Sequence, residues 1–301
     1  ITWGDSFTLA SKPFNYRIMA GIGDNTSKVT KYDNPNRTLT DPYEGQQLGE
    51  IWGYVVDGYF KTDEEARNYK VDQSFVNQMI NASALDNGLH AGDLKFVDLD
   101  GNNKIEQTTS ANDRKDMKVI GNSLPRYNYN FGISADWYGI DFSVLFQGIG
   151  KQNWYPGAET SMFWGPYSRP YASFIPSDFM SQVWSEENTD AYFPRPRGYV
   201  ALGSNRELAV VNTKYLQNLA YCRLKNLSIG YTLPDKWLSK IGFEKIRVYF
   251  SGENLLTFTK LHSDYIDPEQ ASASNSWKTS KSDANIYPWA KTYSFGVDIT
   301  F

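Results

Sequence analysis

The stretch 287–301 constrains the fold of this chain most strongly. It reads YPWAKTYSFGVDITF, and apart from Lys291 every second position carries a large apolar side chain: Trp289, Tyr293, Phe295, Val297, Ile299 and Phe301. Because successive side chains of a strand point to opposite faces, this pattern predicts a strand with one aromatic face and one small, polar face. A soluble protein gains little from an exposed apolar strand that continues to Phe301. The outer face of a transmembrane β-barrel, in contrast, meets lipid.

The same alternation recurs, with varying clarity, in seven further stretches: 1–7, 14–22, 52–56, 127–137, 140–146, 227–231 and 246–258. Upstream of Leu227 the phase slips around Leu224 and Lys225, which predicts a β-bulge. A tilted strand needs about 9–11 residues to cross a bilayer, and these stretches approach that length. The pattern predicts an all-β, antiparallel transmembrane barrel. A soluble β-sandwich or small barrel, whose strands alternate in the same way, is the alternative.

The connections between these stretches differ in length. If the last strand runs towards the periplasm, the links 23–49, 138–139 and 233–244 lie on the periplasmic side. The links 10–13, 61–125, 150–217 and 259–288 then lie outside, and three of these are long. Outer-membrane barrels combine short periplasmic turns with long extracellular loops. The link 23–49 is an exception, because it is long for a periplasmic turn.

Composition narrows the function classes. The net charge of -4 gives no basic footprint for nucleic acid. No run of about 18 apolar residues predicts a membrane-spanning helix, and Cys222 alone cannot form an intrachain disulfide. The chain does not begin with Met and shows no signal peptide, so we take it to be the C-terminal part of something longer.

Six blocks of the sequence resemble successive blocks of the SusC/RagA-like TonB-dependent transporters, in that family's order. They are GEIWGYVVDGYF (49–60), GDLKFVDLDGNNKI (92–105), IGNSLPRYNYNFGISADWYGIDFSVLFQG (120–148), YCRLKNLSIGYTLP (221–234), RVYFSGENLLTFTK (247–260) and YPWAKTYSFGVDITF (287–301).

This resemblance implies that the chain supplies the C-terminal eight or so strands of an outer-membrane barrel of about 22 strands, the size class with a plugged lumen. The plug domain is absent from this chain. The resemblance also implies partners: the TonB complex, which energises import, a SusD-like surface lipoprotein that caps the barrel, and outer-membrane lipid. It implies a dimer of transporter–lipoprotein pairs and a large nutrient as substrate, either a glycan oligosaccharide or a peptide.

The loop 61–125 contains a sequence pattern that resembles a calcium-binding loop. Four residues occupy alternate positions of an EF-hand-type loop: Asp98, Asp100, Asn102 and, through its backbone, Lys104. The place of the final bidentate Glu is taken by Thr109, and Asp113 or Glu106 could complete the coordination. In the resembled family a later Asp-Arg pair follows such a pattern, and here that pair is Asp113-Arg114. A surface turn stabilised by Asp and Asn side chains is the alternative.

Aromatic residues gather after residue 148: Trp154, Tyr155, Phe163, Trp164, Tyr167 and Tyr171. Their flat faces could stack on a sugar or pack on a partner, and Trp154, Tyr155, Trp164 and Tyr167 are the candidate contacts. Alternatively, the loops fold on each other around a small core of their own. Trp277 and Trp289 are candidates for an aromatic girdle at the membrane interface.

The sequence predicts no enzyme. His90 and His262 lie in expected loops without a nucleophile motif, and neither GxSxG nor HExxH occurs. On the polar phase of the strands, Arg17, Asp136, Asp141 and Arg247 are expected to form charge pairs on the lumen side.

Phe301 has a further role by resemblance, as the aromatic signal read by the outer-membrane assembly machinery. A plain girdle residue is the alternative for this position.

Three functions remain open at this point. The first is the barrel portion of a TonB-dependent nutrient importer, the second a soluble carbohydrate-binding β-domain without transport, and the third a small stand-alone porin-like barrel.

Overall fold

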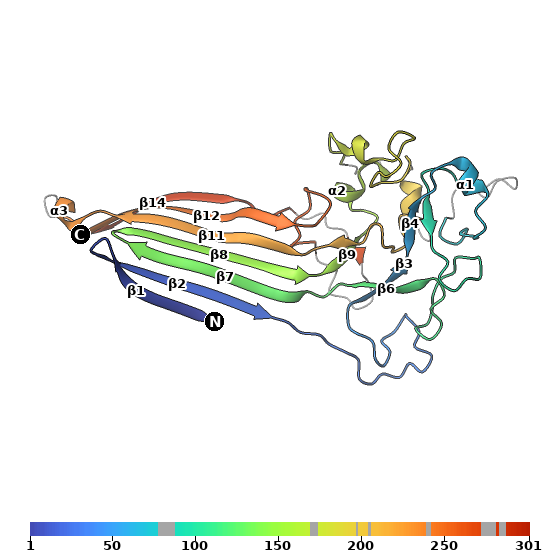
Figure 1. Ribbon diagram of the computed structural model, residues 1–301, viewed down its shortest axis with the longest axis horizontal. Helices are drawn as coiled ribbons and strands as arrows, with labels where there is room; N and C mark the ends of the chain where they lie inside the picture. Colours follow the sequence, from blue (N-terminus) through green and yellow to red (C-terminus); the bar gives the residue numbers. More distant parts are fainter. Residues whose placement is uncertain are drawn as a thin grey trace.

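The computed structural model describes residues 1–77, 88–168, 174–196, 198–203, 206–238, 242–271, 281–282 and 287–301. Within these ranges the largest sheet has seven strands, each antiparallel to its neighbours (Figure 1). In spatial order they are β1 (Thr2–Leu9), β2 (Lys12–Gly23), β7 (Arg126–Trp137), β8 (Ile140–Lys151), β11 (Tyr221–Thr232), β12 (Lys245–Thr259) and β14 (Thr292–Thr300). None of the helices in the described ranges has the length and apolar character needed to cross a membrane.

The two faces of this sheet differ in chemistry, as the alternation predicts. Strand register aligns one apolar row across six strands: Tyr16, Ala135, Phe142, Ile229, Phe250 and Phe295. One position along, and therefore on the opposite face, register aligns a polar row: Arg17, Ser134, Ser143, Ser228, Ser251 and Ser294. The predicted bulge is confirmed, because the register of β11 shifts between Leu224 and Asn226 against both neighbouring strands.

Connections at the two ends of the sheet differ in length. At one end lie the turn at residues 10–11, the turn at Tyr138-Gly139, and the link that contains α3 (Asp235–Leu238). Gly139 has a φ of +83°, and an added Cβ would stand 2.7 Å from the carbonyl oxygen of Thr232, so this tight turn requires glycine. The long segments 24–125, 152–220 and 260–291 all leave from the other end (Figure 1).

The structure corrects the prediction that residues 52–56 form a strand of the barrel wall. β3 (Glu50–Tyr54) pairs with β6 (Met117–Asn122), and β4 (Val56–Tyr59) pairs with β5 (Leu94–Phe96), outside the main sheet. β2 pairs directly with β7. Ile51, at 1% exposed, and Tyr54, at 3% exposed, point to opposite faces of β3, so protein covers both faces of this strand.

This correction changes the placement of two links. The segment 24–49 belongs to one long connection, 24–125, rather than to a periplasmic turn, and the link 10–13 lies at the end with the short turns. The link 23–49 was too long for a periplasmic turn. This difficulty disappears because residues 52–56 are not part of the barrel wall.

The long segments pack together into one region, which we call the loop body (Figure 1). Besides β3–β6 it contains α1 (Asp63–Arg67), β9 (Asn153–Pro156), α2 (Ser161–Trp164), η1 (Gly165–Tyr167), η2 (Phe179–Gln182), η3 (Tyr199–Leu202), β10 (Gln217–Asn218) and β13 (Lys281–Ser282). Its buried cluster draws on residues between Tyr54 and Ala271 and is rich in aromatic rings. Burial of such rings stabilises a region that has few regular elements.

Candidate functional site

The predicted aromatic contacts lie inside the loop body. Trp154, Tyr155 and Trp164 are 0% exposed, and Tyr167 is 1% exposed. Trp164 Nε1 donates to the carbonyl oxygen of Gly157 at 2.9 Å, so even its polar edge is occupied. The structure therefore corrects the assignment of these four residues as substrate or partner contacts: they build the core of the loop body. Tyr171 lies outside the described residues.

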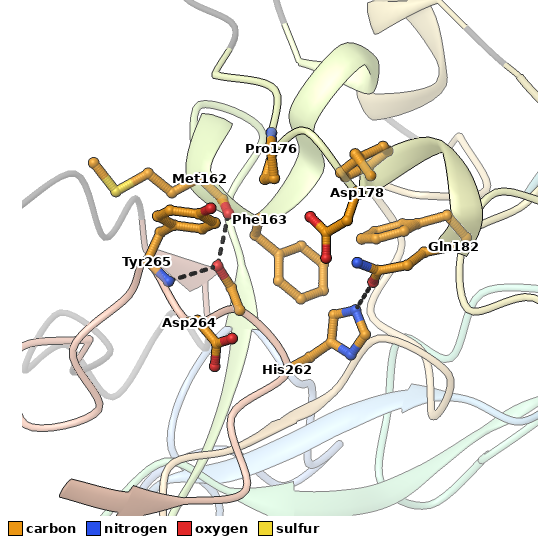
Figure 2. A pocket seen from close by; sticks show the side chains of 11 residues that line it. Met162, Phe163, Pro176, Asp178, Gln182, His262, Asp264 and Tyr265 are labelled. Atoms are coloured by element: carbon orange, nitrogen blue, oxygen red, sulfur yellow. Dashed lines mark hydrogen bonds between the residues drawn. The ribbon is translucent and has the colours of Figure 1, made fainter.

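A pocket of about 80 Å³ lies beside this core. Residues from α2 (162–163), from the stretch 176–182 that includes η2, and from 262–265 after β12 line it together with Phe193 (Figure 2). Ser263 Oγ donates to the carbonyl oxygen of Met162 at 2.8 Å, which joins the segment after β12 to α2. Residues of two separate connections, 152–220 and 260–291, thus share one pocket.

His262 occupies one side of the pocket. Its ring stacks on Tyr192, with centroids 3.5 Å apart and planes 14° apart, and its Nε2 lies 2.8 Å from Gln182 Oε1. Partial burial lowers the pKa of His262, the positive charge of Lys214 acts in the same direction, and Asp264 opposes them. The lowered pKa favours the uncharged imidazole, which contributes a polar edge to the pocket.

The pocket has an acidic lining. Figure 2 shows the Asp178 carboxylate directed between the Phe163 ring and the Gln182 amide, with Asp264 at the lower edge. Within the described residues, neither carboxylate makes an ion pair or a hydrogen bond, and no Lys or Arg lines the pocket. The sequence reading missed this site. The polar and aromatic run HSDY (262–265), which follows β12, was the sequence feature that could have indicated it.

A buried charge network holds the segment that carries His262 against the sheet. Arg223 of β11 bonds through Nη2 to Asp267 at 2.7 Å and through Nη1 to Glu269 at 2.5 Å, and Lys225 Nζ reaches Glu269 at 2.8 Å. The side chains of Arg223 and Asp267 are only 3% and 4% exposed. We call these four residues the Arg223 clamp. It fixes the segment 260–271, and with it one wall of the pocket, to the bulged end of β11.

The acidic loop assembles with one change from the prediction. Carboxylate oxygens of Asp98, Asp100 and Asp116 lie within 4.8 Å of one another. Asp113 does not belong to this group, so Asp116 takes the place predicted for it. Burial raises the pKa of Asp116, and the charges of Asp100 and Asp98 add to the effect. Three converging carboxylates supply the hard oxygen donors that Ca²⁺ prefers.

Local hydrogen bonds also stabilise this loop as a turn. Asp98 accepts from the backbone N–H groups of Gly101 and Asn103, both at 2.7 Å, and Asn102 Oδ1 accepts from the Lys104 N–H at 2.8 Å. The turn predicted as the alternative is therefore present. These hydrogen bonds fix the positions of the carboxylates within the turn.

The predicted charge pairs on the polar face are found in part. Arg247 bonds to Asp141 at 2.6 Å and to Asp298 at 3.2 Å. Asp136 instead accepts a hydrogen bond from Asn15 Nδ2 at 2.7 Å. For Arg17, the described residues provide no ion-pair partner.

Two aromatic residues of the sheet edge are exposed. Phe301 is 81% exposed, its ring centroid lies 5.2 Å from that of Phe243, and its role as an assembly signal stays a prediction. Trp289 is 52% exposed, whereas Trp277 lies outside the described residues.

Comparisons with known proteins agree with the fold. No protein-family model matches. The chain is similar to TonB-dependent receptor P3 of Formosa agariphila, with 28% identity over 264 residues that make up 86% of this chain and 22% of the relative. Receptor P39 of the same organism is 25% identical, over 99% of this chain and 30% of the relative.

Solved structures of the RagAB peptide importer have the same fold. In the open-open state the TM-score is 0.63 at 18% identity, over 100% of this chain and 28% of the matched chain. In the closed-closed state the TM-score is 0.59 at 20% identity. The fold class and the resemblance to TonB-dependent transporters, both drawn from the sequence, are confirmed. The chain spans about a fifth to a third of the length of these relatives.

Proposed function

We propose that this chain is part of the wall and outer surface of an outer-membrane importer for large nutrients. Import is energised by TonB, and a SusD-like surface lipoprotein caps the barrel. In this proposal the edge strands β1 and β14 pair with the remaining strands of the barrel, and transporter–lipoprotein pairs form a dimer. The substrate class is a glycan oligosaccharide or a peptide. No catalytic step is part of the proposal, and Ca²⁺ bound to the acidic loop would have a structural role.

One observation carries this proposal: the sheet has an apolar face and a polar face, and its long connections all lie at one end. On the apolar face Phe295 is 83% exposed and Tyr293 is 61% exposed. Large apolar side chains in adjacent rows are unfavourable in water. The hydrocarbon interior of a membrane would cover them along the whole sheet. The names of the relatives support the same reading, since all are TonB-dependent receptors.

A matched pair of substitutions tests the membrane orientation. Phe295→Arg, made in the full-length protein, puts a cation on the apolar face in mid-strand, where it costs about 2–4 kcal/mol in lipid. Ser294→Arg puts the same cation on the polar face. We expect Phe295→Arg to reduce the heat-modifiable, folded form in outer-membrane fractions, and Ser294→Arg to leave it close to wild type.

The alternatives give different results. In a soluble carbohydrate-binding β-domain the protein would need no detergent, and Phe295→Arg would be harmless or would improve solubility. A stand-alone porin-like barrel would need detergent but would take up nutrient without TonB. Uptake that persists in a strain lacking TonB therefore contradicts the importer proposal even if the membrane orientation is correct.

A further inference from the structure

We propose that the pocket at His262 binds a positively charged group of the imported nutrient, an ammonium or a guanidinium, and so selects a basic peptide over a neutral glycan. This inference rests on the proposed import function and names the substrate class. It combines three properties of the pocket: unpaired carboxylates, aromatic walls and a size suited to one functional group.

The charge of the pocket is the first argument. Asp178 and Asp264 bring two negative charges, and within the described residues neither has a cationic partner. The lowered pKa of His262 favours its uncharged form, which does not compensate them. Both carboxylates are exposed, so their attraction for a cation is a surface interaction that weakens as the salt concentration rises. A cationic group gains from this site, whereas an anionic group is repelled.

The walls of the pocket are the second argument. Phe163, Phe179 and Phe193 line it, and Tyr265 stands at its rim. Aromatic faces attract ammonium and guanidinium groups through the ring quadrupole. The loop body already uses this interaction close by: Lys214 Nζ lies 4.8 Å from the ring centroid of Tyr59 and 5.6 Å from that of Tyr192, the ring on which His262 stacks.

Size is the third argument. A water-sized group needs about 10–15 Å³ of such a cavity, so a volume of about 80 Å³ holds the end of a side chain rather than an oligosaccharide. Polar atoms of Gln182 and His262 stand at the same opening and can orient the N–H groups of a bound guanidinium.

A second, wider hollow also borders η2 and also has an acidic lining. Glu186 and Glu187 line it beside Trp184. The one cation lining it in the described residues, Arg195, is engaged by the buried carboxylate of Asp93 at 2.6 Å. A peptide with two basic residues could therefore place one in each hollow.

The test uses the full-length protein in detergent and three probes: the pentapeptide Gly-Lys-Gly-Lys-Gly, its counterpart Gly-Glu-Gly-Glu-Gly, and maltohexaose. Each is titrated against wild type, against the double variant Asp178→Asn/Asp264→Asn, and against Asp235→Asn. Asp235 in α3 lies at the opposite end of the molecule and controls for the loss of a surface carboxylate. Asn preserves the shape of Asp, and Asp178 and Asp264 are exposed, so the variants are expected to fold.

We expect the lysine peptide to bind most tightly, and the double variant to weaken it about tenfold and reduce its salt dependence. Asp235→Asn should match wild type. Equal binding of the three probes, or an unchanged lysine-peptide Kd in the double variant, overturns the inference. TonB-dependent uptake of the neutral glycan alone would keep the import proposal and reject this pocket assignment. Loss of TonB dependence would reject import, while the titration would still report on the pocket.

Discussion

Arg223 shows how much of the loop arrangement depends on single charged residues. Its guanidinium is almost fully buried, yet it makes ion pairs with Asp267 and Glu269 and a further hydrogen bond to Thr257 Oγ1 at 2.9 Å. Asp267 in turn accepts from the backbone N–H of Trp289 at 3.1 Å. The clamp therefore connects β11 with both the beginning and the end of the connection between β12 and β14.

Removing the arginine should loosen this connection. Arg223→Met leaves the buried Asp267 without its cation, and breaking a buried pair in this way costs about 3–5 kcal/mol. We expect faster hydrogen exchange across residues 260–271 and weaker binding at the His262 pocket, with the sheet unchanged. Arg17→Met, which removes an arginine without an ion-pair partner in the described residues, is the matched control. Equal exchange in both variants would show that the clamp does not position the segment.

The acidic loop offers a second residue-scale prediction. If Asp98, Asp100 and Asp116 bind Ca²⁺, calorimetric titration of the full-length protein should show stoichiometric heat, lost in Asp98→Ala and in Asp116→Asn. Asp113→Asn should bind as wild type does, because Asp113 lies outside the carboxylate group. Heat that is absent from wild type, or lost equally in Asp113→Asn, would leave the loop as a self-stabilised turn.

At the scale of elements, the sequence predicts the wall strands well and the loop body poorly. Strands such as β7, β8 and β14 repeat one phase over the length of a bilayer, and that period is local information. The strand at 50–54 has Trp52 and Tyr54 two positions apart as a wall strand would, yet protein covers both of its faces. A short period-2 pattern cannot tell lipid from protein as its apolar neighbour. The sequence signal against a wall strand was the long link 23–49.

The corrected topology can be checked by labelling. Two single-cysteine variants are made in the full-length protein, in which Cys222→Ser has first removed the native thiol. Lys31→Cys lies in the connection 24–125, and Ser11→Cys lies in the short turn between β1 and β2. We expect a membrane-impermeant maleimide to label Lys31→Cys on intact cells, and Ser11→Cys only after the outer membrane is permeabilised. The opposite pattern would restore the strand at 52–56 to the wall.

The candidate site was hidden from the sequence for a related reason. Its residues come from three stretches, near 162, 178 and 262, that no local period connects. The aromatic residues that stood out in the sequence became the core, since the largest apolar side chains gain most from burial. Polar residues that belong to no sequence motif, such as Asp178 and Gln182, line the opening. Only the packing of the long connections on one another brings them together.

At the scale of the whole molecule, two different principles hold the chain together. The sheet depends on strand pairing, and in the proposed function lipid covers its apolar face. The loop body depends on a water-excluded core of its own, in which Phe193 stacks with Tyr167, Phe179 and Tyr215 at centroid distances between 4.7 and 6.1 Å. The two parts meet at the Arg223 clamp and along the ends of the strands. Such an arrangement allows the loop body to loosen while the wall remains intact.

Phe193→Ala tests this independence. Phe193 is 1% exposed, and truncating a buried Phe costs about 3–5 kcal/mol through lost burial and the cavity left behind. We expect hydrogen exchange to rise throughout the loop body, including Trp164 and Tyr215. The wall strands β7, β8, β11, β12 and β14 and the heat-modifiable folded form should keep their wild-type behaviour. Phe174→Ala removes a ring that is already 40% exposed and should change little. If Phe193→Ala also unfolds the sheet, the two parts form one cooperative unit, and the loop body cannot rearrange around a substrate without disturbing the wall.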